Sequence, residues 1–292
     1  MARRSRWGFP GMLAENSICL AGELIRIIRR KRLPPQTRVH GGWWWTWRWR
    51  FEFVTGWLDL ESVVAVRRAL VPGDVVLDIG AHAGYYSLLF SRLVGPSGAV
   101  FSFEPDPVNF GVLQHNLRGS GAENAGAFNL AISERCGPVS LHRSAGSGNH
   151  SLFPYTEPVE IISVRSTTVD AFLAARGKPE VALIKLDIEG AEPLALAGMG
   201  ETLSRCHGVR LIVEYNPKAL RSAGDSPEHL LQSLRSLGFR LWRLELDKAP
   251  EPVETFLDPE PQSAINLFCS RLGPPGEGGK QEIPGWFRSD LT

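Results

Sequence analysis

The amino-acid sequence predicts an α/β protein built on a doubly wound, largely parallel sheet. The main observation is a series of short, continuously apolar segments, such as 75–79, 181–186 and 209–214, separated by segments with helical patterns. Strands with this composition are buried on both faces, because helices cover both sides of a parallel sheet. The second observation is a glycine turn directly after the first apolar segment, the place where open α/β sheets bind ligands.

The expected elements follow in chain order from residue 58. A first helix ends at Pro72-Gly73, since proline cannot continue a helix, and the first buried strand follows it. Alternation of helical and extended patterns then continues to residue 269, interrupted by a polar stretch at 137–165 in which we expect a hairpin. Helices are expected at 60–70, 85–94, 107–118, 168–175, 192–197 and 227–237, and strands at 75–79, 99–103, 127–130, 181–186, 209–214, 240–244 and 263–269.

The charge distribution divides the chain of 292 residues into unlike parts. The net charge is only +1, yet residues 1–50 hold eleven Lys/Arg and two Asp/Glu, and six of the nine tryptophans lie between Trp43 and Trp57. We therefore expect a basic, Trp-rich extension at 1–56, formed by a helix and a β-hairpin. A sheet domain is expected at 57–271, and a Gly/Pro-rich flexible tail at 272–292.

The second strand of the expected hairpin alternates, with an aromatic residue at every odd position from Trp43 to Phe53 and Arg48 and Arg50 on the opposite face. A single apolar face is what packing on the protein body requires, and we favour that interpretation. The alternative is a surface that binds nucleic acid or a membrane through arginine and aromatic rings. We expect no nucleic-acid partner, and peripheral membrane contact is the less favoured interpretation.

The cysteine pattern and the hydropathy of the chain argue against several other classes of protein. The four cysteines are scattered without a C-x-x-C pair, which favours neither a zinc site nor a disulfide framework and fits a reducing cytoplasm. No apolar run approaches the roughly 20 residues that span a bilayer. The sequence carries no indication of the oligomeric state.

The glycine turn has the spacing Asp78-x-Gly80-x-x-x-Gly84, with His82 inside it. Gly80 allows close backbone approach to a ligand, and Gly84 lets the next helix begin close to the strand. A carboxylate at Asp78 is unfavourable beside a pyrophosphate but suits the ammonium group of S-adenosylmethionine. Glu104 ends the second strand, where an acid can accept both ribose hydroxyls. The pair favours S-adenosylmethionine over NAD, and an NAD-linked oxidoreductase is the alternative enzyme class.

Three segments, 78–86, 103–107 and 184–192, together resemble the FkbM family of S-adenosylmethionine-dependent methyltransferases, and the third, Lys-x-Asp-x-Glu-Gly-Ala-Glu, is the most specific. The resemblance covers roughly residues 58–245. It implies a class I methyltransferase fold, Rossmann-like, with seven strands of which the last is antiparallel. It also implies O-methylation of a sugar, a polyketide or a related natural product. The family often has Asn where this chain has His82, and Ala131 falls in the segment that should flank adenine.

The expected chemistry is methyl transfer to a hydroxyl of a small-molecule or glycan acceptor, which benefits from a base near the reacting oxygen. Asp187, at the end of the fourth strand beside the first, is our first candidate for that base or for positioning the acceptor. Glu189 can share its role, and His150, in a polar loop, can supply an imidazole. Asp187, Glu189 and Glu214 together leave a divalent cation open as an alternative, although we expect no metal site.

Overall fold

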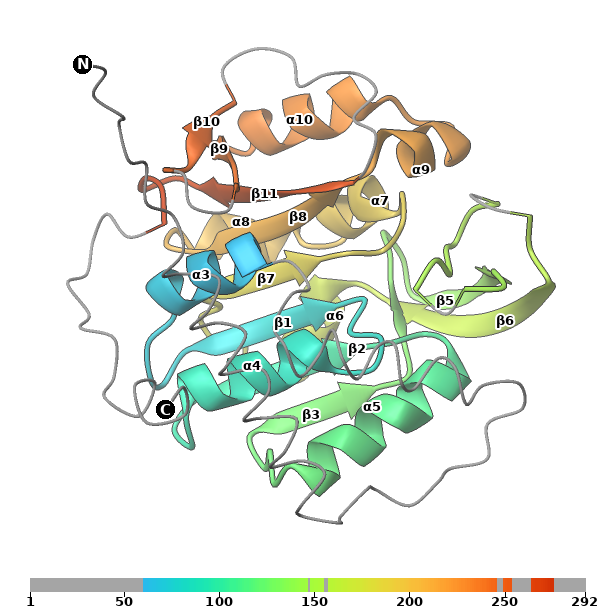
Figure 1. Cartoon of the computed structure of the whole chain (residues 1–292), viewed down its shortest axis with the longest axis horizontal. Helices are drawn as coiled ribbons and strands as arrows, with labels where there is room; N and C mark the ends of the chain where they lie inside the picture. The colour runs from blue at the N-terminus through green and yellow to red at the C-terminus, as the bar shows by residue number, and fades with distance from the viewer. Residues whose placement is uncertain (1–59, 147, 155–156, 246–248, 254–263, 276–292) are drawn as a thin grey trace, which may run out of the picture. The chain divides into compact units, whose positions relative to one another are not determined.

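The computed structural model describes residues 60–275, apart from 147, 155–156, 246–248 and 254–263 (Figure 1). The expected extension at 1–56, with its tryptophan-rich hairpin, therefore lies outside the described residues, as does the tail beyond residue 275. The domain boundaries proposed from the sequence, 1–56, 57–271 and 272–292, remain predictions.

The described residues form one large sheet in which the strands at the centre are parallel. β11 runs antiparallel between β8 and β9, as expected for the last strand. The short β10 extends the expected set of seven strands at one edge. From edge to edge the order is β10 (Glu251–Pro252), β9 (Arg240–Arg243), β11 (Ile265–Ser270), β8 (Arg210–Tyr215), β7 (Leu183–Leu186), β1 (Val75–Ile79), β2 (Ala99–Phe103) and β3 (Ala125–Phe128).

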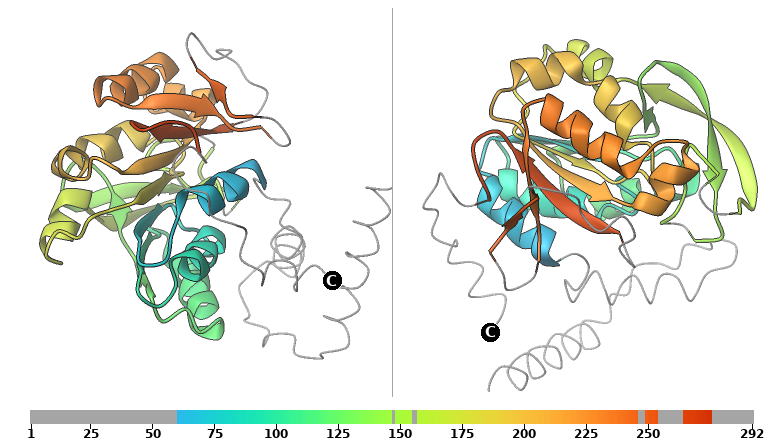
Figure 2. Two further views of the ribbon diagram at one scale, coloured as in Figure 1. Left: turned by 90° about the vertical axis from the view of Figure 1, so that its left-hand side faces the viewer. Right: turned by 90° about the horizontal axis from the view of Figure 1, so that it is seen from above.

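Helices cover both faces of this sheet, which makes a three-layer α/β arrangement (Figure 2). One face carries α3 (Leu60–Ala69), α4 (Tyr85–Val94) and α5 (Pro107–Gly119). The other helices are α6 (Val169–Ala174), α7 (Glu192–Ala197), α8 (Gly200–Arg205), α9 (Pro217–Ser222) and α10 (Pro227–Ser236). The doubly wound fold predicted from the sequence is confirmed.

A second, three-stranded sheet lies near the carboxyl ends of the parallel strands (Figure 1). It consists of β4 (Ala131–Ile132), β6 (Glu160–Thr167) and β5 (Gly137–Arg143), in that order. β5 and β6 pair antiparallel from Gly137–Ser166 to Arg143–Glu160, which confirms the hairpin expected in the polar stretch. Ser151, in the connection between β5 and β6, contacts the loop after β7, because its hydroxyl donates a hydrogen bond to the carbonyl oxygen of Glu189.

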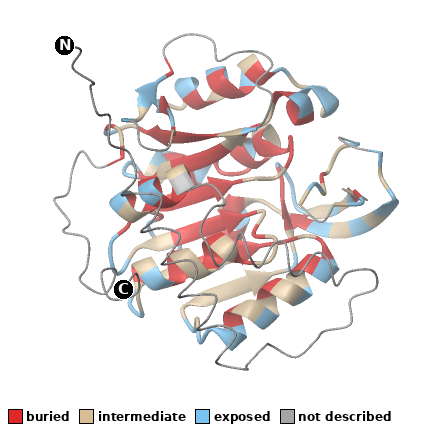
Figure 3. Cartoon of the chain, in the orientation of Figure 1, coloured by how far each residue is buried: buried red, intermediate tan, exposed pale blue. Residues whose placement is uncertain are grey.

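The central strands are the most deeply buried part of the sheet (Figure 3). Along β1 the side chains alternate: Val76 packs with α3 and α4, and Leu77 packs in the core on the opposite face. Asp78 therefore points to the α4 side, as does Lys185, its register partner on β7. This alternation places two buried charged residues on one face of the sheet centre.

The structure differs from the sequence prediction mainly in short elements. α8, α9, β4 and β10 contain only two to six residues each, too few to show a periodic pattern. The third strand ends at Phe128 instead of residue 130. The reason is that the Asn129 side chain turns back to donate hydrogen bonds to the carbonyl oxygens of Glu104 and Pro105.

No helix among the described residues has the length and apolar character needed to cross a membrane.

We predict that Phe172→Ala destabilises the fold by about 3–5 kcal/mol, the usual cost of truncating a buried aromatic residue. The ring of Phe172 lies in edge contact with Phe103 and Phe128, at centroid distances of 4.6 and 4.7 Å. Urea unfolding measures the change. Val159→Ala is the matched control, because this side chain is 68% exposed and its truncation should cost under about 0.5 kcal/mol. Equal effects of the two substitutions would contradict the assignment of Phe172 to the core.

Candidate active site

The carboxylate of Asp78 lies at the end of β1 and is 1% exposed. One of its oxygens accepts a hydrogen bond of 2.6 Å from the Ser87 hydroxyl on α4. The other, Oδ1, is buried and has no hydrogen-bond partner among the described residues. Burial raises the pKa of Asp78, and the nearby Lys185 ammonium opposes that rise. A buried carboxylate oxygen without a donor favours a ligand that supplies one.

Gly80 allows the loop after β1 to touch the loop after β7. Its φ is +85°, and a Cβ at this position would lie 1.9 Å from the carbonyl oxygen of Asp187. Every other residue type would push the two loops apart. Gly84 is the N-cap of α4 and has a φ of +91°. A Cβ at this position would lie 2.7 Å from a methyl group of Leu113 on α5. A backbone contact thus requires glycine at position 80, and the left-handed φ favours it at position 84.

Glu104 follows β2, and its buried carboxylate accepts two backbone hydrogen bonds. The N–H of His82 donates to Oε2 at 2.9 Å, and that of Asp106 donates to Oε1 at 2.8 Å. Burial raises the pKa of Glu104 to about 8, although these hydrogen bonds favour the ionised form. Each carboxylate oxygen keeps capacity for a further donor. The β1 and β2 loops are therefore joined through one acid that can still bind hydroxyl groups.

His82 has a positive φ of 48°, which is uncommon for a residue other than glycine. Burial lowers the pKa of its imidazole to about 4, so the ring is neutral at neutral pH. A neutral imidazole has one donor and one acceptor, like the amide of an asparagine. The charge of Asp187 raises the pKa of this ring and that of His150 lowers it, but both effects are smaller than the effect of burial.

Asp187 is paired with a buried cation. Lys185 Nζ lies 2.5 Å from Asp187 Oδ2, and the lysine side chain is 2% exposed. The same Nζ lies 4.6 Å from the centre of the Tyr86 ring on α4. The ion pair holds one carboxylate oxygen of Asp187 in a fixed position beside the loop that contains Gly80.

The next acid, Glu189, is held by a strained turn. Its φ is +52°, and Gly190 follows at +96°. The carboxylate of Glu192 accepts from the N–H groups of Ile188 and Gly190, at 3.1 and 3.0 Å, and so closes the turn. Burial and the charges of Asp187 and Glu192 raise the pKa of Glu189 to about 8. Backbone strain of this kind is concentrated at functional sites.

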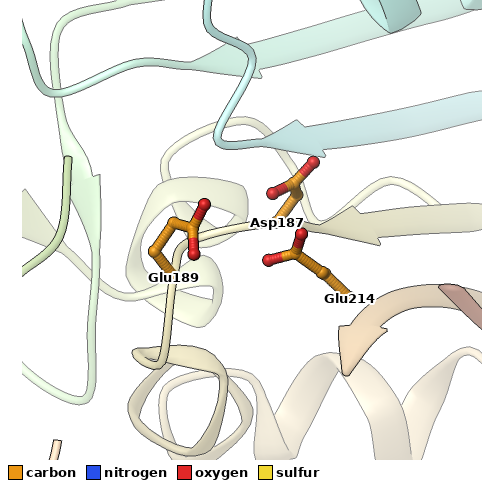
Figure 4. Close-up of side chains that lie close together, drawn as sticks. All are labelled: Asp187, Glu189 and Glu214. Atoms are coloured by element: carbon orange, nitrogen blue, oxygen red, sulfur yellow. The ribbon is translucent and has the colours of Figure 1, made fainter. Parts of the chain in front are cut away.

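Three carboxylates converge at the ends of β7 and β8 (Figure 4). One oxygen each of Asp187, Glu189 and Glu214 lies within 4.8 Å of the others. The Asn216 side-chain amide donates to Glu189 Oε2 at 3.0 Å. Burial and the neighbouring acids raise the pKa of Glu214 well above its usual range. Oxygen atoms at this spacing attract a cation, and the Lys185 ammonium already supplies one at Asp187.

The structure places His150 in the loop after β5, beside Asp106 and Arg143, whose charges act on it. Its Nδ1 accepts a bond of 3.2 Å from the Ser144 N–H, and burial lowers its pKa. The following Ser151 hydroxyl donates to the carbonyl oxygen of Glu189 at 2.6 Å. This loop is therefore hydrogen-bonded to the backbone of Glu189, one member of the acid cluster formed by Asp187, Glu189 and Glu214. His150 lies near the cluster without belonging to it.

The expected place of Ala131 beside adenine stays a prediction. Ala131 is buried in β4, where it pairs with Ser166 of β6. Asn129, which bonds the Glu104 carbonyl, stands closer to the cofactor loops.

Three residues of the site have no role predicted from the sequence: Ser87, Glu192 and Asn216. Glu192 had a visible signal in the family motif, but its position in the first turn of a helix has an ordinary explanation as a helix-terminal acid. Ser87 and Asn216 are common polar residues, and only the folded chain brings them against Asp78 and Glu189.

These residues fit S-adenosylmethionine. Asp78 Oδ1 is a buried acceptor without a partner among the described residues, Gly80 leaves no room for a side chain, and Glu104 has free acceptor capacity at the next strand end. Asp78, Gly80, His82, Gly84 and Glu104 would hold the cofactor, with Asp187 near its reactive part. The fold and the site together define a class I S-adenosylmethionine-dependent methyltransferase.

Comparison with known proteins makes the assignment more specific. Residues 78–241 match the family model of the methyltransferase FkbM domain, and the chain belongs to this family. It is 30% identical to the 2-O-methyltransferase NoeI of Sinorhizobium fredii, over 58% of this chain and 76% of that protein. It is also 30% identical to the 31-O-demethyl-FK506 methyltransferase FkbM of Streptomyces tacrolimicus, over 44% of this chain and 61% of that protein.

A solved structure, that of methyltransferase FkbM from Methylobacillus flagellatus KT, is similar with a TM-score of 0.45 and 14% identity. The similarity covers 88% of this chain and 58% of that one.

We predict that the affinity for S-adenosylhomocysteine rises between about pH 6 and pH 9, as Glu104, with its pKa of about 8, ionises. Ribose hydroxyls donate more strongly to a carboxylate than to a protonated acid. Glu104→Gln should reduce the affinity about 10- to 100-fold at pH 9 and flatten its pH dependence. Calorimetry measures both effects, with the exposed Glu123→Gln as control. An unchanged affinity and slope in Glu104→Gln would disprove the assignment.

Proposed function

We propose that this methyltransferase acts on a hydroxyl group of a sugar, a polyketide or another natural-product or glycan acceptor, and that it works in the cytoplasm. The observation that supports this most strongly is the contact between Gly80 and the backbone of Asp187, which brings the cofactor loop against the acid cluster. The names of the two curated relatives, both O-methyltransferases, favour an oxygen acceptor. The family assignment argues against the NAD-linked alternative.

The bound cofactor supplies an electrophilic methyl group on a sulfonium. The chain then has to hold the acceptor oxygen in line with that methyl group, at about 3–3.5 Å, and to remove the hydroxyl proton. Asp187 is suitably placed to remove this proton, because its Oδ2 is bound to Lys185 and its Oδ1 can accept a hydrogen bond from the acceptor. Glu189 and Glu214 provide polar groups for neighbouring hydroxyls of a polyhydroxylated acceptor.

His150 is the second candidate base in this proposal. Its lowered pKa favours the neutral imidazole, which can accept a proton. The Ser151–Glu189 hydrogen bond keeps its loop close to the acid cluster. We assign His150 to the wall of the acceptor site and Asp187 to the reacting hydroxyl, because Asp187 directly contacts the cofactor loop.

We predict that Asp187→Asn lowers the methyl-transfer rate by about 10²–10⁴-fold, the usual contribution of a general base. Asn keeps the shape of the side chain and an oxygen that can accept from Lys185, so S-adenosylhomocysteine should bind with unchanged affinity. A radiolabel assay with a panel of sugar and polyketide alcohols measures the transfer, and calorimetry measures the binding. Glu123→Gln, an exposed acid, is the control for general loss of charge.

If Asp187→Asn lowers the methyl-transfer rate by less than about tenfold, Asp187 is not the general base. The rate of His150→Gln then tests the second candidate.

A further inference from the structure

Lys185 occupies an unusual position in this structure. Among the residues that the structure describes, it is the one lysine or arginine that is buried. Burial of an unpaired ammonium is costly, so a buried lysine needs compensating charge. Here that charge is abundant, since Lys185 lies at the centre of the sheet where the carboxyl ends of three strands meet.

The groups around Lys185 come from several elements. β1 contributes Asp78, its register partner, and α4 contributes the Tyr86 ring at 4.6 Å. The loop after β7 contributes Asp187, at 2.5 Å from Nζ. The charge of Lys185 also acts on Glu189, on Glu214 and on the His82 imidazole, and Glu192 lies behind Glu189. The charge of this one buried cation therefore acts on four carboxyls, those of Asp78, Asp187, Glu189 and Glu214.

We propose that Lys185 is a positioning residue for methyl transfer: its ammonium fixes the Asp187 carboxylate and takes the place that a divalent cation would have among the strand-end acids. This inference rests on the proposed function of Asp187 as the group that receives the acceptor's proton. It goes further because it assigns the positive charge that balances the acid cluster to a side chain of the protein itself.

The geometry explains why the lysine is required. The carboxylate oxygens of Asp187, Glu189 and Glu214 converge within 4.8 Å, and repulsion between ionised acids at that distance raises the pKa of Glu189 and of Glu214, which the Lys185 ammonium lowers. The Lys185 side chain approaches Asp187 from the α4 side, which leaves the other oxygen of Asp187 for an acceptor. The Tyr86 ring attracts the ammonium through its π face and restricts its position.

The first measurement is a ¹³C NMR titration of the glutamate carboxyl groups in the full chain, with Glu189→Gln to identify the Glu189 signal. In Lys185→Met, which removes the charge at similar length, the Glu189 midpoint should move up by about half a pH unit or more, because the Lys185 ammonium lowers the pKa of Glu189. Lys185→Arg, which keeps the charge, should move it by less than about half a unit. Lys178→Met is the control, because Lys178 is an exposed lysine. An unmoved midpoint in folded Lys185→Met would overturn the proposal.

A second measurement needs no lysine variant and covers the case in which Lys185→Met does not fold. A buried ammonium held by a carboxylate exchanges slowly and gives its own ¹H–¹⁵N lysine signal, which Asp187→Asn should shift or broaden. A spectrum in which no lysine ammonium signal responds to Asp187→Asn would contradict the ion pair.

A third measurement tests the claim about the metal ion directly. Calorimetric titration of the wild-type chain with MgCl₂ should give no saturable binding that depends on Asp187. Binding that disappears in Asp187→Asn would show that a metal ion and not Lys185 balances the cluster. None of these readouts requires an acceptor or turnover, so a failure to detect methyl transfer would count against the proposed function alone.

Discussion

The close approach of two loops, one after β1 and one after β7, is the constraint on which the rest of the site depends. It exists because β1 pairs with β2 on one side and β7 on the other, all parallel, so that their carboxyl ends reach the same edge of the sheet. Gly80 then lets the two backbones touch where a Cβ would lie 1.9 Å from a carbonyl oxygen. This contact brings the residues suited to the cofactor next to those suited to the acceptor.

At the same edge of the sheet, burial makes the ionised form of several acids unfavourable. Asp78, Glu104, Glu189 and Glu192 are all buried, and the pKa of each is raised mainly by burial. Backbone N–H groups compensate Glu104 and Glu192, a serine hydroxyl compensates one oxygen of Asp78, and an asparagine amide contacts Glu189. Acids that remain this strongly perturbed after such compensation are typical of sites prepared for a ligand. The buried oxygen of Asp78 that has no partner among the described residues is the clearest example.

The large features could be predicted from the sequence because they depend on local chemistry. α4 and α7 have the expected bounds of residues 85–94 and 192–197, since α4 begins at a left-handed glycine and α7 has a proline in its first turn. The sequence predicts Asp78, Glu104 and Asp187 as site residues because each lies near the end of an apolar strand or directly after one. Their convergence at one edge is a consequence of parallel order.

Other features could not be read from the sequence because they depend on tertiary contacts. The positive φ of Glu189 cannot be predicted from the sequence, because glutamate has no preference for that backbone conformation. The hydrogen bond from Ser151 to the Glu189 carbonyl joins positions 38 residues apart through the second sheet. Lys185 and Asp187 are two residues apart, so strand alternation predicts that they share a face. That Lys185 is fully buried there follows only from the packing of α4 over it.

The most direct test of the site is a crystal structure of the full chain with S-adenosylhomocysteine. We expect the ribose hydroxyls on the Glu104 carboxylate, a donor of the ligand on Asp78 Oδ1, and the sulfur atom on the side of the site where Asp187 lies. A ligand bound away from the ends of β1 and β2, or one that leaves Asp78 Oδ1 without a partner and the sulfur remote from Asp187, would contradict the assignment of these residues to the cofactor and the acceptor.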